Sequence, residues 1–391
     1  MFDLIVDNAR LYPMAGSAER ATHRSFGVLD GRIAAFDVSG PARERIDAAD
    51  RLVLPGFVDC HTHALYAGNR MHEHERRRSG ASYADIAASG GGILSTVRSV
   101  RAASVADLCA ETRPRLAALA REGVTTVEVK SGYGLDLDSE LKMLDAVERL
   151  RRELPIDLSA TCLAAHAVPP GTTRGRYVDF VVDTLLPAVQ ARGLARAVDV
   201  YIEHLAFDLA DAERIFQAAR RLGFGIHAHC EQLSLMHAAE LAARHGALAA
   251  SHLEYLDEGG IAALGAAGSV AILLPGAFYC LNETRRPPIA GLRAARVPMA
   301  VATDLNPGTS PIASLLTCLH MAVTLFGLTS EEALLGVTDH AARALGLEDR
   351  GRLAIGRRAD FSLWDLPDPA MLAYQLGGLA PSAVYVRGKP V

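Results

Sequence analysis

From Leu54 onward the sequence repeats one unit, in which an apolar, β-branched run ends in polar residues and an Ala-, Leu- and Arg-rich stretch follows. The runs have the length of buried strands and the stretches have the composition of helices, so this alternation predicts a parallel sheet. The runs lie at 54–63, 125–132, 156–166, 198–207, 224–232, 247–256, 269–277 and 297–306. Eight strands are the number that closes a (β/α)8 barrel, so we predict an α/β fold with a TIM-like barrel.

The two ends of the chain differ from this central part in their pattern of apolar and polar residues. Residues 1–53 carry short alternating segments separated by Gly and Pro, which is typical of a small antiparallel β unit. A helix is predicted at 330–345, and the following segment 352–364 returns to β texture. We therefore predict two domains, a composite β-sandwich from residues 1–53 and 352–391 and a barrel over 54–351. The helices predicted between the strands lie at 139–153, 210–221, 233–245 and 257–267.

Charge and cysteine content narrow the class of function. The formal net charge is −5, with 40 basic and 45 acidic residues interspersed, which gives no basic field for nucleic acid or an anionic membrane. The six cysteines form no Cys-x-x-Cys pair, and most lie in apolar runs, which indicates reduced, buried thiols. The longest apolar run contains Pro275 and Gly276 and is too short to span a bilayer. We expect a cytoplasmic protein whose partner is a small molecule.

Several predicted strands end in histidine or aspartate. His61 and His63 close the first run, and because strand side chains alternate, both leave on the same face. The later strand ends carry His227, His229, His252 and Asp304. A barrel brings its strand ends onto one rim, where imidazoles and a carboxylate suit a zinc-like or iron(II) ion. Each histidine alone could be a hydrogen-bonded core residue, but their joint occurrence at strand ends favours a metal site.

The same residues resemble the amidohydrolase superfamily of metal-dependent barrel hydrolases. The stretches that carry the resemblance follow one another along the chain at 55–63, 68–70, 80–83, 90–93, 128–135, 165–170, 274–279, 303–311 and 351–361. They are most similar to a mononuclear branch that hydrolyses the cyclic amide of 4-imidazolone-5-propanoate to N-formimidoyl-L-glutamate in histidine degradation. The alternative within the superfamily is another hydrolase, such as a ring aminohydrolase (deaminase). A catalytically inactive barrel kept for binding is disfavoured by the intact histidine and aspartate set.

The resemblance implies one divalent ion, zinc or iron(II), without choosing between them. The implied ligands are His61, His63, His229 and Asp304. In the family the ligand lies three residues before a Gln or Glu that touches substrate, here Gln232, so His229 is preferred to His227. Relatives are often dimers, so we also expect a homodimer.

Two features near the site need separate interpretation. Binuclear relatives hold a second ion with a carboxylated lysine on the fourth strand, whereas Lys130 lies on the second predicted strand. We therefore expect Lys130 to be a salt-bridged or supporting residue. His204 and Leu205 depart from the family's usual run before Ala206, which leaves the local structure after the fourth strand open.

Substrate recognition is implied by further matches. The substrate carries a propionate, and the fork of Arg70 suits a carboxylate. The resemblance also implies ring and product contacts from Tyr133, His166, Gln232, Asn306, Gly308 and Thr309. The charged segment 72–78 is interpreted as a solvated helix face, neither a metal site nor a nucleic-acid site.

The resemblance also implies a mechanism. A divalent ion lowers the pKa of bound water from about 16 towards 7, which makes hydroxide available at neutral pH. Asp304 and His252 are both placed to accept the water proton, and the sequence leaves the operative base open. The ion or His166 would polarise the ring carbonyl, while Arg70 orients the propionate.

Overall fold

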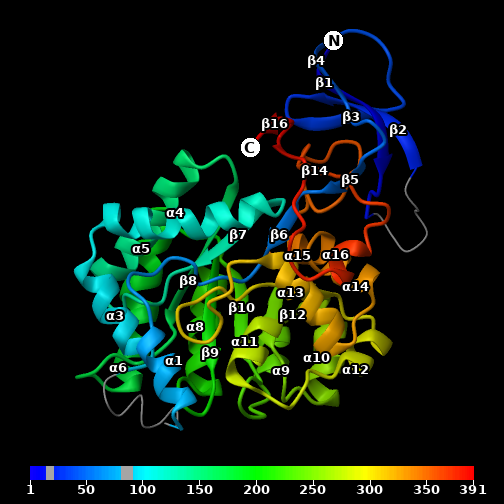
Figure 1. Cartoon of the computed structure of the whole chain (residues 1–391). Helices are drawn as coiled ribbons and strands as arrows, with labels where there is room; N and C mark the ends of the chain where they lie inside the picture. The colour runs from blue at the N-terminus through cyan, green and yellow to red at the C-terminus, as the bar shows by residue number, and fades with distance from the viewer. Residues whose placement is uncertain (15–21, 81–90) are drawn as a thin grey trace.

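The structure is a computed structural model that describes residues 1–14, 22–80 and 91–391. Residues 81–83 and Gly90, which belong to two of the stretches matched to the superfamily, lie outside the described residues. The chain forms a parallel barrel and a second sheet, and this sheet stands above the barrel and contains both termini (Figure 1). The predicted fold is thereby confirmed.

The barrel strands pair in parallel and in chain order, each with the next. They are β6 (Phe57–Asp59), β7 (Val124–Lys130), β8 (Asp157–Ala165), β9 (Ala197–Ile202), β10 (Gly225–Cys230), β11 (Ala249–His252), β12 (Val270–Leu273) and β13 (Met299–Val301). The first and last strands meet just beyond their ends, where Asp304 N donates to His61 O at 3.0 Å. His63 N donates to Leu305 O at the same distance, so backbone hydrogen bonds close the barrel beside the predicted ligands.

Helices surround the barrel and lie between its strands in the chain (Figure 1). They are α1 (Met71–Arg78), α3 (Ile93–Ala102), α4 (Val105–Arg121), α5 (Leu137–Glu153), α6 (Arg174–Phe180), α7 (Leu186–Ala191), α8 (Leu209–Arg221), α9 (Ala238–Arg244), α10 (Glu258–Ala267), α11 (Pro275–Leu281), α12 (Ile289–Ala294), α13 (Leu315–Met321), α14 (Ser330–Gly336), α15 (Asp339–Ala344) and α16 (Met371–Tyr374), with π-helical turns η1 (Val181–Leu185) and η2 (Ala322–Phe326). Among the described residues, no helix has the length and apolar composition needed to cross a bilayer.

Local chemistry explains where several helices begin and end. Asp136 caps α5 and Asp208 caps α8, each accepting a hydrogen bond from a backbone N–H in the first turn. The helix predicted at 330–345 is two helices, α14 and α15, because the backbone turns at Val337. There the Val337 carbonyl accepts from Val58 N at 2.8 Å, which ties the break to the first barrel strand. The helix predicted at 233–245 begins later, at Ala238.

The second sheet is built from both ends of the chain. Its strands are β1 (Phe2–Leu11), β2 (Thr22–Leu29), β3 (Arg32–Phe36), β4 (Ala42–Asp47), β5 (Leu52–Pro55), β14 (Phe361–Trp364), β15 (Ala383–Val386) and β16 (Lys389–Pro390). Strand β5 pairs with β1 on one side and with β14 on the other, so the N- and C-terminal segments share one hydrogen-bonded sheet. Buried aromatic rings of Phe26, Phe361 and Tyr385 pack together in its core.

The predicted run 54–63 is divided between the two sheets. Strand β5 ends at Pro55 in the second sheet and β6 begins at Phe57 in the barrel, so Gly56 is the crossing point. Gly56 N donates to Asp360 O at 2.9 Å. A Cβ atom at Gly56 would overlap the side chain of Thr125, whose own Cβ would lie only 2.9 Å away. The close approach of β7 therefore requires glycine here.

We predict that Gly56→Ala lowers the free energy of unfolding by about 1–3 kcal/mol, because the added methyl group overpacks a buried contact. The measurement is the midpoint of denaturant unfolding. Gly175→Ala is the matched control, since a Cβ there meets nothing within 4 Å, and its midpoint should be unchanged or slightly higher. Equal midpoints for both variants would refute the steric argument.

Candidate metal centre and active site

Three buried histidine side chains meet at the carboxyl-terminal rim of the barrel. His61 and His63 follow β6, and His229 lies in β10. One ligand atom from each lies within 4.8 Å of those of the other two. Asp304, just after β13, places Oδ1 at 3.6 Å from His61 Nε2 and at 3.4 Å from His63 Nε2. The three histidines therefore form one group and Asp304 lies against two of them, although the four predicted ligands come from three separate parts of the chain.

Hydrogen bonds on the outer ring nitrogens orient two of these imidazoles, those of His61 and His229. His61 Nδ1 lies 2.9 Å from Ser251 Oγ, and His229 Nδ1 lies 3.0 Å from Asp199 Oδ1. The Nε2 atoms of His229 and His63 are 3.3 Å apart, a distance at which two lone pairs repel unless a proton or a cation lies near both. This arrangement of inner nitrogens held by outer hydrogen bonds is common for histidines that bind metals.

An unsatisfied atom tests whether the residues fit a metal ion. His61 Nε2 is buried and has no hydrogen-bond partner within the described part of the chain. An orphaned buried polar atom is costly, and coordination to a cation would satisfy it. Burial and the nearby charge of Lys130 lower the pKa of His61 well below its usual range, and burial does the same for His63. Both imidazoles are therefore neutral, which is the form that binds metals.

A buried ion-pair network supports His229. Lys130 Nζ lies 2.8 Å from Glu128 Oε1 and 2.9 Å from Asp199 Oδ2, and all three side chains are fully buried. Burial disfavours the charge on Lys130, but Asp199 and Glu128 outweigh it and raise the pKa of the lysine. Lys130 is thus a charged, salt-bridged residue on β7, as expected from its position in the sequence. Asp199 connects it to the His229 ring.

His252 ends β11 and faces the histidine cluster. Its ring centroid is 5.5 Å from that of His229 and 6.1 Å from that of His61. The backbone is left-handed at His252 (φ 77°) and at Asp304 (φ 50°), where non-glycine residues are uncommon. Such backbone strain persists where the surrounding structure enforces it, often at functional sites. His227 lies on the same strand as His229 but outside the three-histidine group, and burial lowers its pKa to about 4.

Two predicted substrate residues lie against the cluster. The His166 ring stacks on the His63 ring with centroids 5.1 Å apart, and Tyr133 lies 5.3 Å from His166 by the same measure. Burial lowers the pKa of His166 to about 3, so the ring is neutral. Its Nδ1 atom lies 3.1 Å from Gly132 O and must carry the proton to bond a carbonyl, which leaves a lone pair on Nε2.

The loop after β13 holds the remaining predicted contacts. The Asn306 amide nitrogen donates to Asp304 O at 2.7 Å, and its oxygen accepts from Gly308 N at 2.8 Å and from Thr309 N at 2.7 Å. Asn306 thus shapes the loop in this structure, and its predicted substrate contact stays a prediction. Arg70 reaches the loop from the start of α1 and covers Gly308. Gln232 is half-buried, two residues beyond the end of β10.

Sequence reasoning missed the residues that orient the ligands. Asp199, Glu128 and Ser251 are buried in barrel strands, and each contacts either a ligand or Lys130. A signal was present, because Asp199 is a carboxylate inside the apolar run of β9 and Glu128 is one inside β7. Buried carboxylates need charged or hydrogen-bonding partners, so each could have been flagged.

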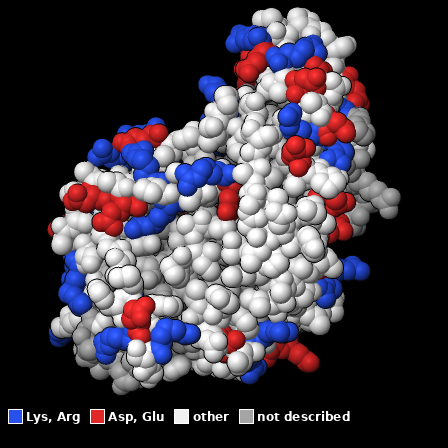
Figure 2. Space-filling model, in the orientation of Figure 1, with Lys and Arg blue, Asp and Glu red and all other residues white. Residues whose placement is uncertain are grey.

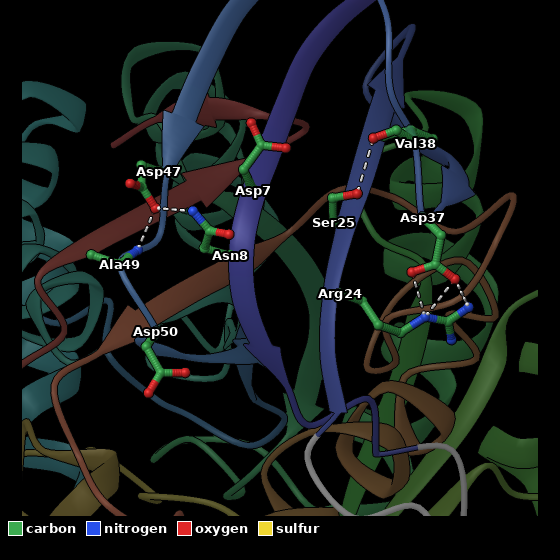
Figure 3. A pocket seen from close by; sticks show the side chains of 9 residues that line it. All are labelled: Asp7, Asn8, Arg24, Ser25, Asp37, Val38, Asp47, Ala49 and Asp50. Carbon is green, nitrogen blue, oxygen red and sulfur yellow. Dashed lines mark hydrogen bonds and ion pairs between the residues drawn. The ribbon is translucent and has the colours of Figure 1, made fainter.

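A hollow also lies in the second sheet. It has a volume of about 760 Å³ and is formed by polar and acidic residues of the second sheet (Figure 3). Several of these residues bond one another, since Asp47 accepts from Asn8 and Ala49, and Arg24 pairs with Asp37. Its described lining contains none of the candidate metal-centre residues. Basic and acidic side chains are also interspersed on the molecular face in Figure 2, so no single-sign field dominates that face.

Comparison with known proteins identifies the class. The sequence profile of the amidohydrolase family matches residues 52–391. Imidazolonepropionase from Pseudomonas aeruginosa is 56% identical over 356 residues, which are 90% of this chain and 88% of that protein. Imidazolonepropionase from Stenotrophomonas maltophilia is 52% identical over 93% of this chain and 92% of its own length. The chain therefore belongs to the amidohydrolase family and, within it, to the family of imidazolonepropionases.

Solved structures with the same fold are more distant in sequence. An adenosine deaminase from Xanthomonas campestris with bound zinc aligns with a TM-score of 0.75 at 18% identity, over 100% of this chain and 92% of that one. A triazine hydrolase variant aligns with a TM-score of 0.78, also at 18% identity, over 99% and 94%. At this identity the similarity establishes the shared fold alone.

We predict that His229→Ala abolishes metal retention, whereas His227→Ala keeps it, because only His229 belongs to the three-histidine group. The measurement is metal content by elemental analysis after desalting, with circular dichroism to verify that both variants fold. The two histidines share one strand, so each variant is the control for the other. Metal loss in the His227 variant alone would mean that the wrong histidine has been assigned.

Proposed function

We propose that this chain hydrolyses the cyclic amide of 4-imidazolone-5-propanoate to N-formimidoyl-L-glutamate. The observation that carries the proposal is that His61, His63 and His229 form one group at the barrel rim with Asp304 against two of them, while the largely buried Arg70 lies against the loop after Asp304. Relatives named imidazolonepropionase, at more than half sequence identity over most of both chains, support the same substrate. A cytoplasmic location and assembly as a homodimer stay predictions.

One divalent ion, zinc or iron(II), fits the centre. His61, His63 and His229 would bind it through nitrogen and Asp304 through oxygen, which is a ligand set that these metals accept. When bound, such an ion lowers the pKa of water and polarises a carbonyl oxygen. Lys130 is positively charged and pairs with two carboxylates, and a charged, paired lysine does not bridge two metal ions. This favours one ion over two.

Two residues are candidates for the proton transfers that open the ring. The Asp304 carboxylate and the His252 imidazole both border the histidine cluster, and His252 Nδ1 is buried without a hydrogen-bond partner in the described structure. One of them accepts the proton of the attacking water, and the proton is then delivered to the ring nitrogen as the C–N bond breaks. Both assignments follow from placement beside the ligands.

The resemblance implies that His166 contacts the substrate ring and that either the ion or His166 polarises its carbonyl, and we propose the ring contact alone for His166. Because its Nδ1 proton is held by Gly132 O, its Nε2 atom can accept a hydrogen bond but cannot donate one. A carbonyl oxygen needs a donor, whereas a ring N–H needs an acceptor. We therefore assign His166 to an N–H group of the substrate ring, and polarisation of the carbonyl does not rest on this residue.

We predict that the purified, metal-loaded chain converts 4-imidazolone-5-propanoate to an equal amount of N-formimidoyl-L-glutamate. The measurement is loss of substrate absorbance, with the product identified by mass spectrometry. Prolonged chelation should abolish turnover, and added zinc or iron(II) should restore it, because no other described group replaces the ion's charge.

The deaminase alternative gives a different result in the same experiment. A ring aminohydrolase would release ammonia from an amino-substituted ring and leave the imidazolone ring closed. Stoichiometric ammonia from purine or pyrimidine substrates, without imidazolone opening, would contradict the proposed function.

A further inference from the structure

Arg70 is held by a carboxylate that sequence reasoning assigned to a solvated helix face. Its Nε atom donates to Glu73 Oε2 at 2.7 Å, and Nη2 lies 2.7 Å from the same oxygen. Both side chains are largely buried, with 8% of Arg70 and 12% of Glu73 exposed. A charge pair that is shielded from water and bonded at two nitrogens restricts the guanidinium strongly. Glu73 therefore fixes where Arg70 points.

The other oxygen of Glu73 is anchored in turn. Glu73 Oε1 accepts from Gly92 N at 2.8 Å, and Gly92 is the N-cap residue directly before α3. The carboxylate thus bridges the Arg70 guanidinium and the first turn of a second helix. Because Glu73 contacts α3 as well as Arg70, the position of the guanidinium depends on two helices and not on α1 alone.

Gly308 lies over the flat face of the guanidinium, next to Nη1. A Cβ atom at Gly308 would overlap Nη1 of Arg70 and lie 2.5 Å from its Cζ. The arginine can occupy this position only because residue 308 has no side chain. Gly308 also lies in the loop that follows Asp304, where Gly308 N donates a hydrogen bond to the side-chain oxygen of Asn306. The positions of the arginine and of the proposed metal ligand are therefore coupled.

Among the described residues, Glu73 is the carboxylate that pairs with the guanidinium. Glu73 occupies the Nε–Nη2 edge, so a carboxylate must approach the Nη1–Nη2 edge. The guanidinium lies against Gly308, in the loop that follows the proposed ligand Asp304. The geometry favours one orientation of the bound carboxylate, and hence of the ring attached to it.

We propose that Glu73 is a positioning residue for the substrate carboxylate, acting through Arg70, with Gly308 providing the clearance that this position requires. The inference rests on the proposed function for the identity of the substrate, but not for the carboxylate site itself. In this role Glu73 acts on the arginine and not on the reacting ring. Its loss should therefore weaken substrate capture and leave the metal centre intact.

The test is a double-mutant cycle of Glu73→Ala and Arg70→Met. Glu73→Ala should raise KM on the order of tenfold with kcat nearly unchanged, and Glu73→Gln, which keeps one oxygen, should recover part of the loss. In the Arg70→Met background, Glu73→Ala should have no further effect, because the arginine through which it acts is absent. Glu75→Ala is the matched control on the same helix and should match the parent enzyme.

A binding measurement separates this inference from the proposed function. The Kd of the inert ligand imidazole-4-propanoate should change across the cycle as KM does, and metal content should be the same in all variants. Gly308→Ala should weaken binding in the parent enzyme but not in the Arg70→Met variant.

If the parent enzyme binds this ligand without hydrolysing the imidazolone, the proposed function is wrong and the carboxylate site is still supported. Additive effects of Glu73→Ala and Arg70→Met, or tighter binding by Glu73→Ala, would overturn the positioning role, as would an absence of ligand binding by the parent.

Discussion

The contact of His229 with Asp199, which is itself held by Lys130, is the constraint on which the candidate site depends. Asp199 is buried and charged. His229 Nδ1 lies 3.0 Å from one oxygen of its carboxylate and Lys130 Nζ lies 2.9 Å from the other, and these two contacts offset the free-energy cost of burying the charge. The carboxylate fixes the His229 tautomer so that Nε2 faces His63. Burying each of these charges costs free energy. The network is stable because each charged group has a partner of opposite charge or a hydrogen-bond partner within it.

Barrel closure brings the rest of the centre together. The seam between β6 and β13 is formed by backbone hydrogen bonds at His61 and Asp304, so the residues that close the fold are also proposed ligands. Thr303 strengthens the seam by donating to both carboxylate oxygens of Asp59, at 3.1 Å from its nitrogen and 2.6 Å from its hydroxyl. The metal centre and the stability of the barrel are thus coupled through the same few residues.

The barrel could be predicted from sequence because its signal is periodic and local. Each apolar run carries its own length and polar end, and motif spacing then selects His229 over His227. The passage of 54–63 from one sheet to the other could not be predicted, since it depends on β14 pairing with β5 from the far end of the chain. The ion pair of Glu73 with Arg70 was missed for the same reason. Charges within 72–78 favour a solvated face, and only tertiary structure brings Arg70 and Gly92 to this carboxylate.

The most direct test of this account is the zinc affinity of Asp199→Asn, measured by competition with a chromophoric chelator and compared with the parent chain. The substitution keeps the side-chain shape but removes the charge that orients His229 and balances Lys130. We predict a Kd for zinc about 10–100-fold weaker, with native circular dichroism retained. An unchanged affinity in a folded variant would contradict the claim that this buried carboxylate organises the metal centre.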